Sequence, residues 1–149
     1  MTVRIRPMRA SDLAAIALIE KQITWSRQLN SLRRELAAMI RGRKGICLVA
    51  EVDGRVGGFI VGDVAPWEFG EDEKVAWVKV IGVDPKHQGE GLGKTLGNAL
   101  LTELRKRGIR RVKTLVEWYA GDMLAYFQTL GFDRSGAIVL ERDVRAGRR

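Results

Sequence analysis

The apolar positions of residues 1–45 predict a strand followed by two helices. Val3 and Ile5 alternate with polar neighbours up to Pro7, which indicates a short strand. Ser11 is a suitable N-cap residue, and the apolar residues after it recur at helical spacing. Similar spacing over 31–41 predicts a second helix, which the glycine-rich stretch at 42–45 interrupts.

The middle of the chain is rich in β-branched residues, which predict three strands. The first covers 46–52, and Asp53-Gly54 after it is a strong hairpin signal into a second strand at 55–64. The third covers 74–83 and ends at Asp84-Pro85, because proline has no N–H to donate to a strand ladder. Cys47 lies within the first of these strands and is therefore expected to be a small core residue rather than a nucleophile.

Helical spacing returns in the second half of the chain, where a leucine recurs every four residues over 92–104 and predicts a helix at 91–107. The other elements expected there are a strand at 109–118, a helix from Asp122 to Leu130, a last strand at 138–144 and a frayed basic tail at 145–149. The order strand-helix-helix-strand-strand-strand-helix-strand-helix-strand, with no repeat or linker, predicts one mixed α/β domain over 1–149.

Composition narrows the functional classes. The chain has 149 residues with one cysteine and one histidine, so it cannot form an intramolecular disulfide framework or a Cys/His zinc cluster, and we expect no metal. No apolar run approaches the roughly 18 residues of a transmembrane helix, and residues 1–4 do not begin a signal peptide. We therefore expect a cytoplasmic protein with no membrane partner.

Charge is distributed unevenly along a chain whose formal net charge is +8. Residues 1–44 carry ten basic and three acidic side chains, whereas residues 45–73 carry one basic and seven acidic ones. An acidic segment in a basic protein suits a cationic substrate, because several carboxylates raise the local concentration of an ammonium ion. A loop that is merely solvated explains the same pattern, and the charges alone do not choose between these interpretations.

A glycine-rich turn at 83–94 joins the strand at 74–83 to the long helix after it. Gly89, Gly91 and Gly93 let the backbone approach a ligand without interference from Cβ atoms. At a helix N-terminus, unpaired N–H groups and the positive end of the helix dipole favour an anion, most naturally a diphosphate. The turn lacks the first glycine of a Walker A loop, and it follows a later strand than a dinucleotide fingerprint would.

Two motifs in this half of the chain indicate a family. The first is Gln-Gly-Glu-Gly-Leu-Gly at 88–93, after a strand that ends Val-Asp-Pro. The second is Tyr-Phe-Gln-Thr-Leu-Gly-Phe at 126–132, an aromatic helix that runs into Leu-Gly-Phe. Together with the order of elements, these motifs resemble the GNAT superfamily of N-acetyltransferases over essentially the whole chain. The resemblance implies a central, mostly antiparallel twisted sheet flanked by about four helices.

The resemblance also implies that acetyl-CoA is the co-substrate. Its pyrophosphate would lie on the backbone amides of 88–94, and its pantetheine arm would pair with 81–83 like an added strand. A splay between the strands at 74–83 and 111–118 would admit that arm. The residues expected at the cofactor are Ile81, Gly82, Val83, Gln88, Gly89, Glu90, Gly91, Leu92, Gly93, Lys94, Asp122 and Phe127.

The family's reaction is direct attack of a neutral amine on the thioester in a ternary complex, in which a base deprotonates the ammonium ion and an acid protonates the thiolate. This chain departs from the family's pattern twice, because Trp77 stands where a basic glutamate is common and Phe127 stands at the tyrosine position. Glu117 is the first candidate for the base and Glu73 the second, with water-mediated deprotonation as the alternative. Tyr126 is the candidate acid and Tyr119, before the same helix, is another candidate, and a packing role is the alternative for both tyrosines.

The implied acceptor is a primary amine on a protein N-terminus, a lysine side chain or a small molecule. We expect it to be cationic and to meet the acidic and aromatic loop at Trp67, Glu71, Asp72 and Glu73. Two other interpretations stay open. One is a CoA-binding protein with little catalytic activity, and the other is a transferase for a nucleic-acid-associated acceptor, which the basic residues of the first two helices would suit. We expect a monomer or a homodimer.

Overall fold

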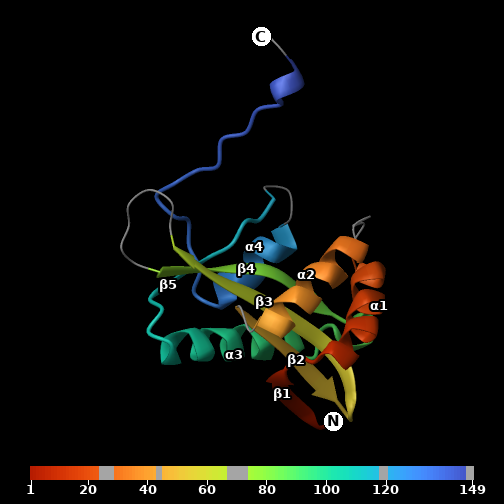
Figure 1. The fold of residues 1–149 in the computed structure, drawn as a ribbon. Coiled ribbons are helices and arrows are strands. Elements are labelled where there is room, and N and C mark those ends of the chain that lie inside the picture. The colour runs from red at the N-terminus through yellow and green to blue at the C-terminus, as the bar shows by residue number, and fades with distance from the viewer. Residues whose placement is uncertain (24–28, 43–44, 67–73, 118–120, 147–149) are drawn as a thin grey trace.

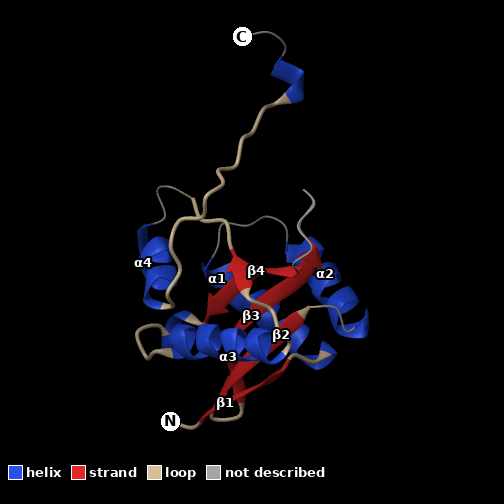
Figure 2. Cartoon of the chain, turned by 90° about the vertical axis from the view of Figure 1, so that its left-hand side faces the viewer, coloured by secondary structure: helices blue, strands red, loops and turns tan. Residues whose placement is uncertain are grey.

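In the part of the chain that the computed structural model describes, five strands form one sheet between two layers of helices (Figures 1 and 2). The structure describes residues 1–23, 29–42, 45–66, 74–117 and 121–146. In sheet order the strands are β1 (Val3–Pro7), β2 (Ile46–Val52), β3 (Arg55–Pro66), β4 (Lys74–Val83) and β5 (Arg111–Lys113). The helices are α1 (Leu13–Ile23), α2 (Leu29–Gly42), α3 (Leu92–Lys106) and α4 (Gly121–Thr129). The mixed α/β class is thus confirmed.

The sheet is mostly antiparallel, as expected. β1 to β4 pair antiparallel with their neighbours, whereas β4 and β5 run parallel. The hairpin between β2 and β3 turns at Asp53 and Gly54, whose φ angles are +51° and +83°. Two successive residues with positive φ are typical of a type I′ turn, whose twist matches that of the flanking strands. The hairpin predicted from these two residues is confirmed.

Each face of the sheet carries its own hydrophobic core. Phe59 and Val61 of β3 face α1 and α2, whereas Ile60 between them faces α3, because successive side chains of a strand point to opposite faces. Cys47 packs against the core under α1 and α2, and burial raises the pKa of its thiol to about 11. A thiol with so high a pKa is a poor nucleophile at neutral pH, which agrees with the expected core role.

The leucine ridge of α3 packs directly onto the backbone of β3. A Cβ atom added to Gly58 would lie 3.0 Å from Leu96 Cδ1 and 3.0 Å from the carbonyl oxygen of Gly82, which is tighter than ordinary van der Waals contact. The helix therefore approaches the sheet more closely than a strand of larger residues would permit. The same fit recurs on neighbouring turns of the helix, between Gly57 and Leu92 and between Gly62 and Leu100.

Helix α4 packs beside α3 at two glycines of α3, Gly93 and Gly97. A Cβ atom at Gly97 would lie 2.5 Å from Leu130 Cδ1 and 2.8 Å from the hydroxyl oxygen of Tyr126. One turn earlier, the Tyr126 hydroxyl donates a hydrogen bond of 2.7 Å to the carbonyl oxygen of Gly93. Glycine at these positions therefore brings the aromatic helix against the first two turns of α3.

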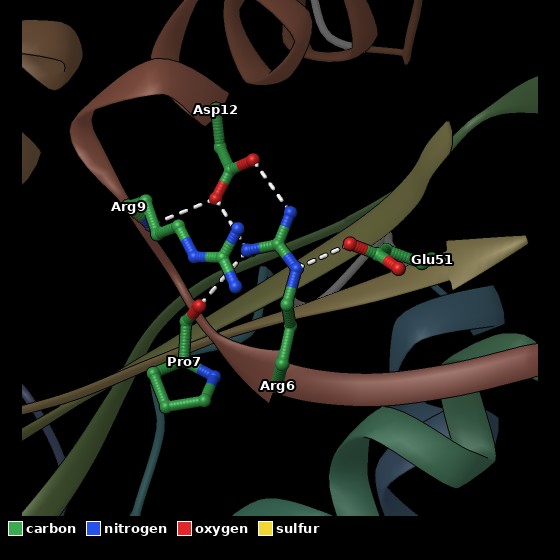
Figure 3. A network of polar contacts seen from close by, with 5 residues as sticks. All are labelled: Arg6, Pro7, Arg9, Asp12 and Glu51. Atoms are coloured by element: carbon green, nitrogen blue, oxygen red, sulfur yellow. Dashed lines mark hydrogen bonds and ion pairs between the residues drawn. The ribbon is translucent and has the colours of Figure 1, made fainter. Parts of the chain in front are cut away.

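A buried ion network joins β1, β2 and the turn that leads into α1 (Figure 3). The two terminal nitrogens of Arg6 donate to the two carboxylate oxygens of Asp12, each at 2.8 Å, and its Nε donates to Glu51. Asp12 also accepts the backbone N–H of Arg9 at 2.7 Å. The Arg6 guanidinium holds the pKa of the Asp12 carboxyl below its usual range. The network anchors the start of α1 to the edge of the sheet.

The C-terminal part of the chain corrects two expectations. β5 covers only Arg111–Lys113 of the strand expected at 109–118, and the strand expected at 138–144 does not form. Residues 133–145 are all exposed and extend away from the rest of the molecule (Figures 1 and 2). Their β-branched residues favour a strand, but a strand forms only where a neighbouring edge supplies hydrogen bonds. A short 3-10 turn at Val144–Ala146 leads into the frayed tail expected at 145–149, of which 147–149 lie outside the described residues.

We predict that Asp12→Asn lowers the free energy of unfolding by about 2–4 kcal/mol at neutral pH, because it leaves a buried guanidinium with only part of its pairing. The pKa of Asp12 is lower in the folded protein than that of an ordinary carboxyl group. The ionised Asp12 therefore stabilises the fold at pH values above the ordinary carboxyl pKa, and this stabilisation is lost as the pH falls through the pKa of Asp12 in the folded protein. The difference between the two proteins in chemical denaturation should therefore shrink below about pH 4. A difference that does not change with pH would contradict this role.

We predict that Gly58→Val destabilises the protein by about 1–3 kcal/mol, because the added carbons meet Leu96 and a backbone carbonyl that cannot move aside. Gly121→Val is the matched control, since a Cβ atom there meets no atom within 4 Å. Its effect on the free energy of unfolding should stay within about 0.5 kcal/mol. Equal denaturation midpoints for the two variants would show that α3 does not depend on this glycine.

Candidate functional site

The chain between β4 and α3 is held against β3 before it reaches the glycines. The backbone N–H of Asp84 donates to the carbonyl oxygen of Gly57 at 2.8 Å. The Asp84 carboxylate accepts the backbone N–H of Lys86 at 3.0 Å and caps a short 3-10 turn at Pro85–His87. A Cβ atom at Gly57 would lie 2.8 Å from Val52 Cγ2 and 3.1 Å from His87 Cδ2, so glycine at this position leaves room for the close approach of the turn. The start of the loop therefore has a fixed position at the end of β4.

The N-terminus of α3 is open and lined by glycine. Gly89 and Gly91 have φ angles of +85° and +79°, a conformation that favours glycine, and a Cβ atom at either would meet nothing within 4 Å. Gly91 is the N-cap residue, and no side chain caps the helix there. The first turn of a helix leaves its amide N–H groups without intrahelical acceptors, and in α3 this turn begins at Leu92. These groups and the helix dipole make the end of α3 suited to an anion.

Polar side chains contact one another on the flanks of the loop. His87 Nδ1 and Glu90 Oε2 lie 3.0 Å apart, and Gln88 Nε2 donates to the carbonyl oxygen of Val83 at 3.5 Å. Lys94 is exposed in the first turn of the helix. Neither of these side-chain contacts uses a first-turn amide of α3, so the flanking residues shape the loop without occupying the anion position.

β4 and β5 separate several residues before this loop, as the resemblance implied. Their parallel pairing covers Val75 to Trp77 on β4 and Arg111 to Lys113 on β5. Just beyond it, the Thr114 hydroxyl donates to the carbonyl oxygen of Val78 at 3.2 Å. From there to its end, β4 pairs with β3 on one side, and no strand of the described chain pairs with its other side. Ile81, Gly82 and Val83 thus lie on a strand with one free edge, leading to the glycine loop.

A β-bulge interrupts β4 next to the point of separation. Val61 of β3 pairs with Val80, and the next residue of β3 pairs with Val78, so Lys79 is an extra residue on β4. A bulge bends its strand and locally disrupts the hydrogen-bond ladder. The sequence carried no signal for it, because bulge position depends on the partner strand.

The two aromatic residues of α4 have different surroundings. Phe127 is 5% exposed and belongs to the core under α3, where its ring contacts those of Tyr126 and Phe132 with centroids 4.9 Å and 5.0 Å apart. Tyr126 is half-buried, burial raises the pKa of its phenol, and its hydroxyl is bonded to Gly93. The structure therefore brings Tyr126 to the glycine loop and directs Phe127 into the core. Asp122 is exposed in the first turn of α4.

The remaining candidate residues lie at the point of separation, beyond it, or outside the described chain. Glu117 is exposed, four residues beyond the last residue of β5. Trp77 is half-buried and lies opposite Lys113. The candidate acceptor loop, Trp67 to Glu73, lies outside the described residues. Within the described ranges, no helix is long and apolar enough to cross a membrane, and no cluster of three His, Cys, Asp or Glu residues is placed to hold a metal ion.

The sequence indicated the residues that line the site, but it did not indicate the residues that hold the site in position. Gly57 and Gly58 let the loop and α3 lie close to β3. Thr114 donates a hydrogen bond to β4 just beyond the paired residues of β4 and β5. The adjacent glycines in a strand were an available signal, because glycine inside a strand often marks a close approach of backbone to another element. Thr114 had no comparable signal.

Comparison with known proteins connects this site to a family. The model of the acetyltransferase (GNAT) family matches residues 10–132. A mycothiol acetyltransferase from Amycolatopsis mediterranei is 42% identical over 103 residues, which are 67% of this chain and 32% of that protein. A second, from Saccharomonospora viridis, is 41% identical over 92 residues, which are 60% of this chain and 30% of that protein. The chain thus spans about a third of the length of these relatives.

Solved structures share the fold. The aminoglycoside N-acetyltransferase AAC(6')-Iy, solved in complex with CoA, has a TM-score of 0.81 at 19% identity, over 96% of this chain and 95% of that one. A possible acetyltransferase from Clostridium difficile has a TM-score of 0.80 at 21% identity, over 97% and 99% of the two chains. The family match covers strands β2 to β5, the glycine loop and the aromatic helix described above, and the chain therefore belongs to the acetyltransferase (GNAT) family.

Proposed function

We propose that this protein transfers an acetyl group from acetyl-CoA to a primary amine on a small molecule. The observation that carries the proposal is the open, glycine-lined N-terminus of α3, which follows the part of β4 that has a free edge after β4 and β5 separate. The free edge of β4 leads directly to the anion site at the start of α3. This arrangement suits a ligand that has an amide-containing arm at one end, for the strand edge, and a diphosphate at the other, for the helix N-terminus.

The glycine loop is suited to the diphosphate of acetyl-CoA. Backbone amides of 88–94 would donate to phosphate oxygens, and Lys94 would add positive charge. The open space in front of Gly89 and Gly91 supports this assignment, because a side chain there would occupy the position of the phosphates. The site needs no basic side chain to bind the anion, since the helix N-terminus supplies both donors and dipole.

The free edge of β4 is suited to the pantetheine arm. N–H and C=O groups alternate along a strand edge, and amide groups of an extended ligand pair with them as an added strand would. We assign this pairing to Ile81, Gly82 and Val83, which lie between the bulge at Lys79 and the glycine loop. Bound acetyl-CoA supplies an acetyl group activated as a thioester, and a backbone N–H of this strand segment is suited to stabilise an oxyanion.

Acid–base groups are fewer than in the family's pattern. Glu117 is exposed beyond β5 and is our candidate for the base that deprotonates the acceptor ammonium, with Glu73 and ordered water as the alternatives. Tyr126 has its hydroxyl committed to Gly93, and its raised pKa makes it a weaker proton donor. We therefore propose that Tyr126 positions α4 against the loop. A thiolate is a tolerable leaving group near neutral pH, so transfer does not require a dedicated acid.

A small cationic molecule is the acceptor class that we favour. The relatives are named for mycothiol and a neighbour in fold is named for aminoglycosides, both small molecules rather than proteins. Five acidic residues lie between Asp63 and Glu73, and carboxylates at this density attract an ammonium ion over a Debye length of about 10 Å at 0.1 M salt. Trp67 would add a cation–π face to Glu71, Asp72 and Glu73.

We predict that Gly91→Val weakens acetyl-CoA binding at least 10-fold in calorimetry, because its side chain would occupy the anion position and strain the N-cap. Gly108→Val is the matched control. Gly108 follows the other end of the same helix with a φ of +75° and open space around it, so this variant carries the same backbone strain away from the loop. Equal acetyl-CoA affinities in the two folded variants would place the pyrophosphate elsewhere.

We predict that Tyr126→Phe lowers kcat less than about 10-fold, raises the KM for acetyl-CoA and destabilises the protein by about 1 kcal/mol, because it removes the hydrogen bond to Gly93. Steady-state kinetics and thermal denaturation of the variant measure these effects. A loss in kcat above about 100-fold with the KM for acetyl-CoA unchanged would instead identify Tyr126 as the acid.

The proposed function is tested by acceptor-dependent release of CoA thiol from acetyl-CoA with a panel of small polyamines, amino sugars and peptides. We expect release above the hydrolysis rate with small cationic amines and none with peptides. Glu71→Gln, Asp72→Asn and Glu73→Gln together should raise the acceptor KM several-fold and weaken its salt dependence, with acetyl-CoA binding unchanged. Tight acetyl-CoA binding without release by any amine would favour a CoA-binding protein with little catalytic activity.

A further inference from the structure

Asp63 is an unusual residue for its place in the sheet. It is the only acidic residue in the sequences of β3, β4 and β5, and aspartate is disfavoured inside strands. The residue is half-buried, and among the described residues its carboxylate has no hydrogen bond or ion pair. The sheet therefore contains a partly desolvated carboxylate that no contact within the described part of the fold stabilises.

The side chain of Asp63 lies on the face of the sheet that α1 and α2 cover. Its two neighbours face the other way, because a Cβ atom at Gly62 would lie 2.9 Å from a leucine of α3, and Val64 packs against the core under α3. Successive side chains of a strand alternate, so Asp63 shares the face of Val61, which is buried under α1 and α2. After burial, the Asp63 charge is the second cause of the raised pKa of Cys47, which packs against that same core.

Asp63 belongs to a row of three residues that crosses the sheet at the point of separation. It is directly opposite Trp77, and Trp77 is directly opposite Lys113. All three residues are half-buried, and theirs is the last row in which β4 and β5 are paired. Lys113 lies two strands from Asp63, which is about 10 Å at the usual strand spacing. The row thus has a carboxylate at one end and a cation at the other.

An acceptor amine has to reach the thioester from the face on which Asp63 lies. With the pantetheine arm assigned to 81–83, the thioester would lie toward the bulge, beside Val80. The α3 side of β4 is filled at this level, because Val78 and Ile81 pack in the core under α3. Val80 itself faces α1 and α2. The row of Asp63 and Trp77 therefore lies on the side from which the amine arrives.

The distance from Asp63 to the thioester position suits a second cationic group rather than the reacting amine. Val80 is paired with Val61, and Asp63 is two residues further along β3. At a rise of about 3.3 Å per residue and a strand spacing of about 4.8 Å, the Cα atoms of Asp63 and Val80 are about 8 Å apart. The reacting nitrogen must come within about 3.5 Å of the thioester carbon. The carboxylate is therefore placed for a group several bonds away in the same acceptor.

We propose that Asp63 binds a second ammonium group of the acceptor, so that the protein selects diamines over monoamines of equal length. This inference rests on the proposed function and specifies the part of the acceptor that does not react. A half-buried carboxylate forms a strong, charge-assisted hydrogen bond with an ammonium ion. Trp77 offers apolar surface to the hydrocarbon chain between the two amines. Lys113 repels an ammonium ion from the other end of the row, which favours binding at Asp63.

Two substrates that differ in one group test the proposal. Diaminobutane with an amine at each end and butylamine have the same chain, and only the diamine carries a second ammonium. For the wild-type protein, kcat/KM from thiol release should be about 10-fold or more higher for the diamine, mainly through a lower KM. Asp63→Asn should raise the KM for the diamine to that for butylamine, with acetyl-CoA affinity in calorimetry unchanged. A wild-type protein without the preference, or a preference that survives in Asp63→Asn, would overturn the proposal.

Two further variants separate the carboxylate from net charge and from folding. Glu103→Gln makes the same change of net charge on α3, which covers the other face of the sheet, and should keep the preference. Asp63→Glu keeps the carboxylate on a longer side chain and should keep a preference for diamines, shifted toward the shorter diaminopropane. Loss of the preference in both Asp63 variants, together with a lower thermal denaturation midpoint, would indicate a structural role and overturn the proposal.

The same assays distinguish failure of this inference from failure of the proposed function. Thiol release with both amines, but without preference for the diamine, would contradict only the role of Asp63. No release with any amine in the wild-type protein would contradict the transferase function and, with it, the second ammonium site.

Discussion

The rest of the molecule depends on how closely α3 lies on β3. Leucines on successive turns of α3 fit against glycines of β3, and a side chain at Gly58 would press on both the helix and the carbonyl oxygen of Gly82. The N-terminus of that helix forms the anion site, and its flank receives α4 at Gly97. A shift of α3 would therefore displace the glycine loop and the aromatic helix together.

The candidate site is built largely from backbone, and this explains how it tolerates unusual side chains. Trp77 and Phe127 stand where the family's pattern has other residues, yet neither position supplies the amides at the end of α3 or the free edge of β4. Side-chain substitutions change proton transfer and acceptor choice first, because those depend on particular functional groups. Binding through a helix N-terminus and a strand edge depends instead on the path of the chain.

The two sides of the β4–β5 pair are open in different ways. The inner gap arises because β5 diverges after Lys113, and it lies next to a positive helix end that suits an anionic ligand. The outer edge of β5 lies next to a cavity that is lined in part by Arg105, Arg110 and Arg111. One short strand thus separates the surface that we assign to the co-substrate from a basic cavity at the outer edge of the sheet.

Local patterns in the sequence determined much of the fold and the location of the site. The Asp53-Gly54 turn requires positive φ angles that few other residue pairs tolerate, and the leucine period of α3 permits only a helix with one buried side. The glycines at 89–93 were recognisable in the sequence for the same reason, because residues within this short stretch set their conformations and leave the helix end open. Features of this kind are readable because their physical cause lies within a few residues.

Contacts between distant segments were decided only by the tertiary structure. The extra residue at Lys79, the end of β5 at Lys113 and the unpaired state of 138–144 depend on which strand edge is within reach, and residue composition does not encode that. Tyr126 and Phe127 are adjacent in sequence, yet one bonds to the glycine loop and the other is in the core, because the packing of α4 on α3 sets the rotation of the helix. Strand pairing and helix rotation are long-range properties, so only the assembled chain determines them.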